Sequence, residues 1–552
     1  MHGLTSRAAA PVLDHVFPAA VQIGTTNTLT FVGKSAAWPP QVWSDAPGMV
    51  FKPTTNTGEV LIVVATNAPP GAHWVRAFNA EGASAPRFLI LTRDPQRAEV
   101  EPNDDRAAAQ SLDQLPTVVN GRLEKTGDVD SFGVQLAAGQ TLVAWLEAYS
   151  LMSPLDPVLR LLDSRGIQVA LNHDRVGSLD PFLTWTAPAQ GRYVLQAFGF
   201  SYPADSDVRF AGSAAGVYRL HVSTGPVLRY TLPLGARRGT NTALQLAGWN
   251  LGTTTRRVPF NPTAGTGPET DVVRFQPEGF DDPVELPVGD GPELLETEPN
   301  DDRTATNALP VPGAITGDLN RAGDEDRFRF SATQGESLIL EVQSARLGFL
   351  LDSWLKVEDS TGKELARNDD ASGPDPRLEW TPPADGPYFA VVGNVLQNGG
   401  TDLWYRLDVR RPKPGLAVTV SENAFSAEPG KTNEIKVTLG RRHGFNVPVR
   451  LTAPGLPADV RVDPVEVAGT AGEGILKLVA AGGAKPFSGP FRIVATETVG
   501  GREREAVMSL VSTGENNGVP QGFSRLVLET ISKFWFTVLS PPPAPKPAAE
   551  KK

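Results

Sequence analysis

The sequence of 552 residues contains no cysteine. This absence excludes disulfide bonds, thiolate metal ligands and cysteine nucleophiles, and it is compatible with any cellular compartment. Histidine is scarce too, with six residues. None lies in the His-Glu-x-x-His spacing of zinc proteases, and no Gly-x-Ser-x-Gly motif of serine hydrolases is present. We therefore expect a non-catalytic protein whose domains are stabilised by some means other than disulfides.

Long apolar runs are missing as well. No run reaches the roughly 18 apolar residues that a membrane span requires, so we expect no transmembrane segment. Residues 1–10 lack the apolar core of a signal peptide. Either an export signal lies upstream of this start, or the protein is not exported by that route. The formal net charge of -11 argues against a nucleic-acid partner and suits a protein that holds cations.

Glycine and proline are abundant instead, with 54 and 49 residues. This composition favours short strands joined by many turns, and the chain length allows several domains. Segments such as Asp130–Leu136 alternate polar and apolar residues with period two, which is typical of strands that bury one face. The sequence thus predicts an all-β fold made of β-sandwiches.

The chain contains a tandem repeat. Glu99–Arg106 recurs as Glu296–Arg303 at an offset of 197, and Gly127–Phe132 recurs as Gly323–Phe328 at an offset of 196. Further matches extend to Tyr193 and Tyr388. So many matches with so little drift indicate two copies of one module, at 98–224 and 295–410.

A smaller repeat precedes each module. Pro11–Gly33 aligns with Pro226–Gly248 at an offset of 215. We therefore expect a small sandwich at 11–97 and a second one at 225–294. The offset of 215 between the small sandwiches exceeds the offset of 197 between the modules by 18 residues. The second small sandwich has therefore lost 18 residues, and we expect it to be trimmed and less regular.

The remaining sequence predicts a fifth sandwich at 411–513 and a short tail at 514–552. Phe491–Ala495 is one of the expected strands of the fifth sandwich. In the tail, the apolar residues between Leu526 and Leu539 fall on one helical face. We interpret this segment as a short helix or strand docking on the last domain, with membrane or partner attachment as the alternative. The Pro-rich end from 541 is expected to be disordered.

Acidic and amide side chains recur at matching places in both modules. Glu99, Glu101 and Asn103 would point to one side of an extended entry segment, and Asp128 and Asp130 would supply further carboxylates from the start of a strand. Packing so many carboxylates together without a cation would be strongly repulsive. The candidate ligands are Glu99, Glu101, Asn103, Asp104, Asp128 and Asp130 in the first module, and Glu296, Glu298, Asn300, Asp301, Asp324 and Asp326 in the second.

The chemistry of these side chains favours Ca²⁺, which takes six to eight hard oxygen ligands in irregular geometry. Magnesium requires a stricter octahedron, and zinc prefers cysteine or paired histidines. A solvated, metal-free acidic linker is the alternative. Because the set recurs in both copies, we expect one structural Ca²⁺ for each module.

These motifs resemble the bacterial pre-peptidase C-terminal (PPC) domain. The resemblance rests on Glu-x-Glu-Pro-Asn-Asp, on Gly-Asp-x-Asp-x-Phe, and on Asn172–Asp174 or Asn368–Asp370 followed by a Gly-x-Tyr strand. It implies a β-sandwich related to the collagen-binding domains of clostridial collagenases, whose calcium ligands correspond to the twelve residues above. His173 departs from the second copy, which has Asp369, and we interpret that region as a turn. The small sandwiches resemble immunoglobulin-like domains of the IPT/TIG type, and the fifth resembles a bacterial immunoglobulin-like fold.

The resemblance implies a location outside the cytoplasm: extracellular, at the cell surface or periplasmic, as in multidomain surface proteins of planctomycete-like bacteria. Adhesion to an extracellular protein or polysaccharide is the favoured role, with exposed aromatics such as Trp145, Tyr149, Trp354 and Trp404 as a hypothetical platform. These aromatics are also compatible with simple core packing. The alternatives are an accessory part of a secreted protease system and a passive structural spacer.

Overall fold

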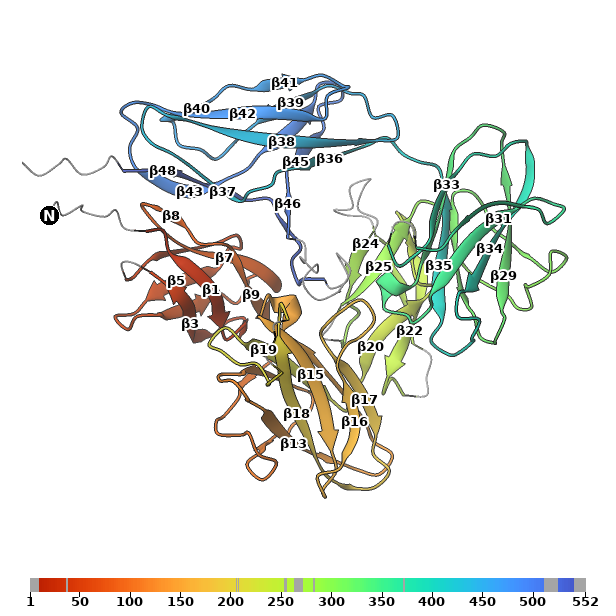
Figure 1. The fold of residues 1–552 in the computed structure, drawn as a ribbon, viewed down its shortest axis with the longest axis horizontal. Helices are drawn as coiled ribbons and strands as arrows, with labels where there is room; N and C mark the ends of the chain where they lie inside the picture. Colours follow the sequence, from red (N-terminus) through yellow and green to blue (C-terminus); the bar gives the residue numbers. More distant parts are fainter. Residues whose placement is uncertain are drawn as a thin grey trace, which may run out of the picture.

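The structure, a computed structural model, describes residues 9–35, 38–204, 206, 208–252, 256–262, 272–280, 283–370, 373–510 and 525–540. The regular elements in these ranges are strands, apart from two 3-10 turns, η1 (Tyr149–Leu151) and η2 (Ala345–Leu347). The strands form five β-sandwiches in tandem, as the sequence predicts (Figure 1). Across the described ranges, no helix has the length and apolarity that a membrane crossing demands.

The first small sandwich consists of two sheets with strand orders β1-β3-β6-β5 and β2-β9-β7-β4, and β8 pairs with β7. Burial alternates along β6, so Val60, Ile62 and Val64 face the core between the sheets. Its strands are β1 (Val12–Phe17), β2 (Ala20–Gln22), β3 (Thr26–Lys34), β4 (Gln41–Ser44), β5 (Met49–Pro53), β6 (Glu59–Val64), β7 (Gly71–Asn79), β8 (Gly82–Ala83) and β9 (Arg87–Thr92).

The two modules share one topology. Each pairs two five-stranded sheets around a core that holds Phe132 and Tyr218 in the first module and Phe328 and Tyr405 in the second. The first has sheets β10-β12-β19-β14-β17 and β11-β13-β18-β15-β16, and the second repeats this order as β26-β28-β35-β30-β33 and β27-β29-β34-β31-β32.

The strands of the first module are β10 (Gln96–Ala98), β11 (Gln110–Ser111), β12 (Thr117–Arg122), β13 (Asp130–Leu136), β14 (Thr141–Glu147), β15 (Leu155–Leu162), β16 (Gln168–Asn172), β17 (Phe182–Thr186), β18 (Gly191–Ser201) and β19 (Val217–Ser223). Those of the second are β26 (Glu293–Leu295), β27 (Asn307–Ala308), β28 (Gly313–Asp318), β29 (Glu325–Ala332), β30 (Leu338–Gln343), β31 (Ser353–Glu358), β32 (Glu364–Asn368), β33 (Arg377–Trp380), β34 (Gly386–Asn394) and β35 (Trp404–Arg410).

The second small sandwich has two three-stranded sheets in its described residues, ordered β20-β22-β23 and β21-β25-β24. Its core is correspondingly small and centres on Leu244, Phe275 and Leu286. Its strands are β20 (Val227–Leu232), β21 (Ala236–Arg237), β22 (Thr242–Trp249), β23 (Arg257–Phe260), β24 (Val272–Phe275) and β25 (Val284–Gly289).

The last sandwich includes part of the expected tail. The apolar segment forms no helix, because β48 (Phe534–Val538) is the middle strand of the sheet β37-β48-β43. This sandwich therefore extends past residue 513. The expected strand Phe491–Ala495 is wrong as one element, since the chain leaves β43 at Phe491 and joins another sheet through β44. The Pro-rich end lies outside the described residues.

The other sheets of this sandwich are β36-β38-β42-β40 and β41-β39-β44-β45, and β46 pairs with β47. The remaining strands are β36 (Gly415–Thr419), β37 (Ala424–Ala427), β38 (Thr432–Arg442), β39 (Val449–Thr452), β40 (Val460–Val462), β41 (Val465–Val467), β42 (Glu473–Ala480), β43 (Phe487–Phe491), β44 (Val494–Glu497), β45 (Glu503–Glu505), β46 (Met508–Ser509) and β47 (Thr530–Ile531).

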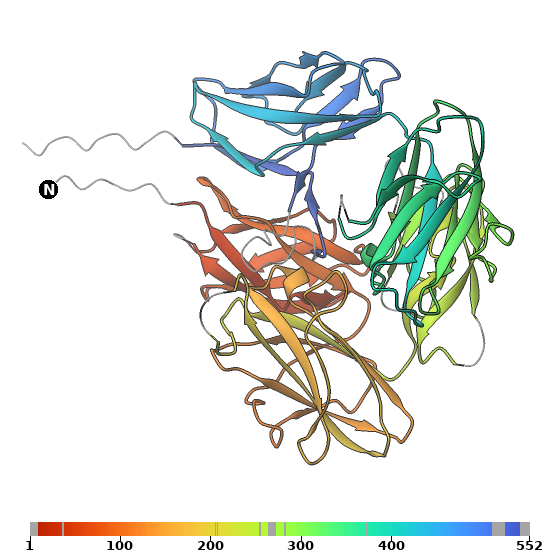
Figure 2. The same cartoon turned by 45° about the vertical axis from the view of Figure 1, so that its right-hand side comes forward.

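The chain of sandwiches turns back on itself, so that the last one lies beside the first (Figures 1 and 2). Trp535 of β48 packs edge-on against Trp43 of β4, with ring centroids 5.7 Å apart. The Lys533 ammonium donates to the Asp45 carbonyl at 3.1 Å. The five sandwiches thus form a closed arrangement rather than an extended rod.

The junction between the first small sandwich and the first module contains a buried histidine. His15 is 1% exposed, and its Nε2 lies 3.0 Å from the Leu151 carbonyl of η1. Burial, aided by the charge of the nearby Arg87, lowers the pKa of His15 to about 4 against the opposing backbone hydrogen bonds to Val16 and Leu151. In the second pair, Tyr230 takes the corresponding place and packs on Phe349.

Acid should therefore destabilise this junction. Below pH 6.5 His15 becomes protonated in the unfolded chain, whereas in the folded chain it stays neutral down to about pH 4. Between these values the folded state should lose up to about 3 kcal/mol through His15. Urea unfolding measured across this range should show the loss. His15→Gln keeps a donor for the Leu151 carbonyl without titrating, so it should reduce the dependence of the unfolding free energy on pH. An unchanged pH dependence in this variant would contradict the assignment to His15.

Candidate metal centres

Each group of candidate ligands gathers where the entry segment of a module meets its core sheets. In the first module, Glu99 and Glu101 follow β10, which pairs in parallel with β12. The loop after β12 carries Asp128, and Asp130 begins β13. The backbone N–H of Ser131 donates to the Asn103 carbonyl at 3.1 Å, which holds the entry segment against β13. Two parts of the chain that are distant in sequence, the entry segment and the segment 128–130, therefore converge.

The first module brings carboxylates into close proximity. One oxygen each of Glu101, Asp128 and Asp130 lies within 4.8 Å of the others. Glu99 is adjacent, and its two oxygens accept from the Arg122 N–H at 2.8 Å and the Tyr218 hydroxyl at 2.9 Å. The same hydroxyl lies 2.6 Å from Asp130 Oδ2.

Several buried polar atoms in this site have no hydrogen-bond partner. Asn103, Asp128 and Asp130 are each 0% exposed. Neither Oδ1 nor Nδ2 of Asn103 is hydrogen bonded, and the Oδ1 atoms of Asp128 and Asp130 accept no hydrogen bond. Buried polar atoms are normally satisfied, so these oxygens are chemically suited to accept from a cation or a hydrogen-bond donor.

The second module repeats the arrangement. One oxygen each of Glu296, Glu298 and Asp326 lies within 4.8 Å of the others. Asn300 is 0% exposed and its Oδ1 accepts no hydrogen bond, as is also true of the Oδ1 atoms of Asp324 and Asp326. The two copies differ in detail. The close triad contains Glu296 in the second module and Asp128 in the first. Asn300 Nδ2 donates to Glu296 at 3.0 Å, whereas Asn103 Nδ2 has no hydrogen-bond partner.

The charge of these carboxyl groups is unfavourable without a cation. Burial raises the pKa of Glu99 to about 7 and that of Asp130 to about 10, with a further increase at Asp130 from the negative charge of Glu99. Burial likewise raises the pKa of Glu296 to about 8 and that of Asp326 to about 10. A divalent cation would offset this crowding of negative charge.

Two functional residues lie outside the sequence prediction. The tyrosines Tyr218 and Tyr405 are buried in their cores, and each hydroxyl donates to an aspartate near the start of a strand in the opposite sheet, Asp130 in β13 or Asp326 in β29. They are separated by 187 residues rather than 196, because the loop before β35 is shorter than the loop before β19. Because their separation differs from the offset of the motifs, the sequence repeat did not identify the two tyrosines as equivalent residues.

Asp104 and Asp301 occupy the rim of each site. Asp104 Oδ2 lies 3.2 Å from the Lys125 ammonium, and Asp301 contacts the guanidinium of Arg321. Both aspartates are only partly exposed, at 40% and 34% of the side chain. They lie next to the buried oxygens but are paired with basic side chains.

A third cluster occurs in the first module alone among the described residues. Asp156, His173 and Asp174 offer ligand atoms within 4.8 Å of one another. His173 Nε2 is already 3.0 Å from Asp156 Oδ1, and this ion pair satisfies both groups. No buried, unpartnered atom of the described residues points into this cluster, so it carries no metal assignment.

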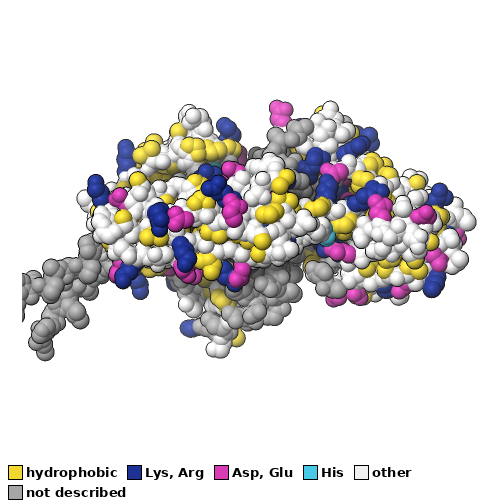
Figure 3. Space-filling view, turned by 90° about the horizontal axis from the view of Figure 1, so that it is seen from above, with side chains coloured by type: hydrophobic (Ala, Val, Ile, Leu, Met, Phe, Trp, Pro, Cys, Tyr) yellow, Lys and Arg dark blue, Asp and Glu magenta, His cyan; other side chains and the backbone are white. Residues whose placement is uncertain are grey.

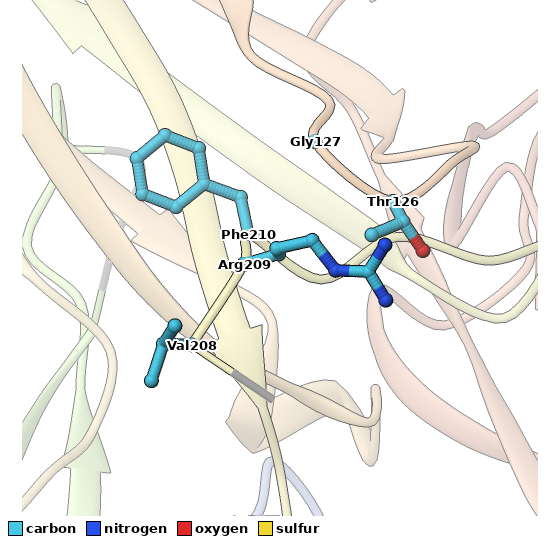
Figure 4. Close-up of a pocket in the computed structure, with 5 residues that line it drawn as sticks. All are labelled: Thr126, Gly127, Val208, Arg209 and Phe210. Atoms are coloured by element: carbon cyan, nitrogen blue, oxygen red, sulfur yellow. The ribbon is translucent and has the colours of Figure 1, made fainter. Parts of the chain in front are cut away.

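A surface hollow borders the loop that carries Asp128, but none of the candidate ligands lines it. It is lined by Thr126, Gly127, Val208, Arg209 and Phe210 (Figure 4). The backbone N–H of Gly127 donates to the Phe210 carbonyl at 2.8 Å, so the loop before β19 braces this region.

The suggested aromatic platform is not a free surface in the described residues. Tyr149 and Trp354 are buried, at 4% and 7% exposure. Trp145 stacks between His221 and Phe182, with ring centroids 4.4 Å and 5.8 Å away. Acidic and basic side chains are interspersed on the face shown in Figure 3, with no field of one sign.

Comparison with known proteins gives local similarities. No protein-family model matches the chain. A probable subtilase-type serine protease of Deinococcus radiodurans is 36% identical over 112 residues, which is 19% of this chain and 15% of that protein. The chain thus spans a small part of the length of this relative.

Among solved structures, two β-sandwich proteins match at low TM-scores. The pre-peptidase C-terminal domain of a Bacillus anthracis collagenase matches at 16% identity and a TM-score of 0.17, over 21% of this chain and 99% of that domain. The four N-terminal immunoglobulin domains of Dscam1 isoform 4.4 match at 12% identity and a TM-score of 0.19, over 91% of this chain and 98% of that one.

Proposed function

We propose that the chain is a non-catalytic, multidomain array that works outside the cytoplasm, and that each PPC-like module binds one structural Ca²⁺. The observation that carries the proposal is the repeated set of buried oxygens without hydrogen-bond partners, on Asn103 and Asp130 and on Asn300 and Asp326. Calcium accepts carboxylate and amide oxygens in irregular geometry, and these donors fit it. Because the chain has no disulfides, a bound ion would stabilise the folded module in their place.

The ion would act at the entrance of each module. In the first, Glu101 and Asn103 come from the entry segment, Asp128 from the loop after β12, and Asp130 from the start of β13. A shared cation would tie these parts together. The entry segment follows directly from the small sandwich, so the ion would also fix how the small sandwich sits on its module.

The proposed non-catalytic role assigns structural contacts to the histidines of the described residues. The histidines whose side-chain contacts the structure describes are held by backbone carbonyls or carboxylates: His15 by Leu151, His73 by Pro69, His173 by Asp156 and His221 by Glu147. The closed arrangement of the sandwiches favours a compact scaffold over an extended spacer. Adhesion to an extracellular protein or polysaccharide, and membership of a secreted protease system, stay predictions.

Calorimetric titration of the full chain tests this proposal. After removal of divalent ions with a chelator, Ca²⁺ should bind with a stoichiometry of two, and Mg²⁺ should bind much more weakly. Glu101→Gln should leave one site, as should Glu298→Gln, and the double variant should leave none. Both residues are exposed, so their replacement should not unfold the modules. A wild-type chain that takes up no Ca²⁺ at millimolar concentration would overturn the proposal.

A further inference from the structure

A basic side chain lies over the rim of each candidate centre. Lys125 Nζ is 3.2 Å from Asp104 Oδ2 and 3.5 Å from Asp128 Oδ1. In the second module, an Arg321 Nη2 atom contacts Asp301 and lies 3.3 Å from Asp324 Oδ1. Each basic residue stands three positions before the aspartate that it reaches. The two modules have thus placed different cationic side chains at the same point.

Lys125 and Arg321 approach the buried Oδ1 atoms of Asp128 and Asp324, which accept no hydrogen bond. The side chains of Asp128 and Asp324 are 0% and 1% exposed, and in both cases Oδ1 accepts no hydrogen bond while Oδ2 accepts from a backbone N–H. The same Oδ1 atom is therefore a candidate ligand for a metal ion and the nearest counter-charge of a basic side chain. Both cations cannot make full use of it together.

The basic side chains are free to leave. Lys125 is 62% exposed and Arg321 is 54% exposed, so each can turn into water with little loss of packing. Ion pairs of such exposure contribute little stability by themselves. Their placement is better explained by an effect on the site than by an effect on the fold.

We propose that Lys125 and Arg321 are built-in competing cations that weaken calcium binding and so set the concentration at which each module is loaded. This inference rests on the proposed calcium function. The cation partly neutralises the acidic cluster when no ion is bound. An arriving Ca²⁺ must displace it from Asp128 or Asp324 and then bind in its repulsive field. At a separation of about 6 Å in water, this repulsion corresponds to about tenfold in affinity.

Neutral variants with long side chains test the inference. The first site is isolated in the Glu298→Gln chain, and calcium titration is compared with and without Lys125→Met. The second site is isolated in the Glu101→Gln chain, with and without Arg321→Met. We expect each methionine variant to bind Ca²⁺ about tenfold more tightly at low ionic strength. The difference should shrink as salt is added, because salt screens exposed charges.

Two control variants separate charge from other effects. Lys125→Arg retains the positive charge and should keep the affinity of the parent chain. Lys34→Met removes an exposed lysine from β3 of the first small sandwich and should change nothing. An unchanged or weakened affinity in Lys125→Met and Arg321→Met, with normal binding by the parent chains, would overturn this inference alone. Failure of every chain to bind Ca²⁺ would instead overturn the proposed function on which it rests.

Discussion

Removal of Ca²⁺ should lower the melting temperature of the chain by roughly 10 °C. A ligand that binds the folded state alone stabilises it by about 2.7 kcal/mol at a free concentration of 100 times its Kd. For a module of this size, that free energy corresponds to a shift of this order. Differential scanning calorimetry with calcium and with a chelator measures the shift directly. The buried carboxylates near Asp130 and Asp326 are the reason that the effect should be large.

Variants connect this shift to the two centres. Glu101→Gln and Glu298→Gln should together abolish it, because each removes a negative charge while a glutamine oxygen can still accept from the N–H of Asn103 or Asn300. Glu422→Gln, at an exposed position in the last sandwich, should retain the full shift. A double variant that still melts at a calcium-dependent temperature would contradict the assignment of the ligands.

Phe536→Ala should destabilise the last sandwich by about 3–5 kcal/mol, the range for truncating a buried aromatic. Phe536 is 0% exposed in the middle strand of its sheet and packs edge-on against Phe491, with ring centroids 6.2 Å apart. Urea unfolding should show an earlier transition for this sandwich, while the calcium-dependent transition of the modules stays in place.

A surface variant provides the comparison for this result. Val499→Ala, at a residue that is 70% exposed, should change the free energy of unfolding by less than about 0.5 kcal/mol. Equal stability of Phe536→Ala and Val499→Ala would mean that the segment 534–538 is not an integral strand of the sandwich. It would then be a loosely docked tail, as one interpretation of the sequence allows.

The sequence predicts the fold well where a pattern repeats. The offsets of 196, 197 and 215 identify paired units, and the period-two segment Asp130–Leu136 is strand β13 over its whole length, although six of its seven residues are buried instead of one face alone. The prediction is weaker for continuous apolar runs. All five residues of Phe534–Val538 are buried, because one side of β48 faces its own core and Trp535 faces the first sandwich. Periodicity cannot distinguish such a doubly covered strand from a helix.

The candidate centres show the same contrast. The acidic residues could be found because they recur in short motifs, and in each module the structure brings carboxylate oxygens from both motifs within 4.8 Å of one another. Tyr218, Tyr405 and the basic residues Lys125 and Arg321 could not be found in this way. The tyrosines follow loops of different length in the two modules, so they do not align at the repeat offset. Lys125 aligns with Arg321, but the two residues differ in type and share only their positive charge, so they form no sequence motif.

The crystal structure of the full chain grown with Ca²⁺ would test the central claim most directly. We predict one strong density peak in each module, about 2.3–2.6 Å from Asn103 Oδ1 and Asp130 Oδ1 in the first and from Asn300 Oδ1 and Asp326 Oδ1 in the second. The peaks should vanish in crystals treated with a chelator. Two sites filled only by water, or by the ammonium of Lys125 and the guanidinium of Arg321 in the presence of saturating calcium, would contradict the account.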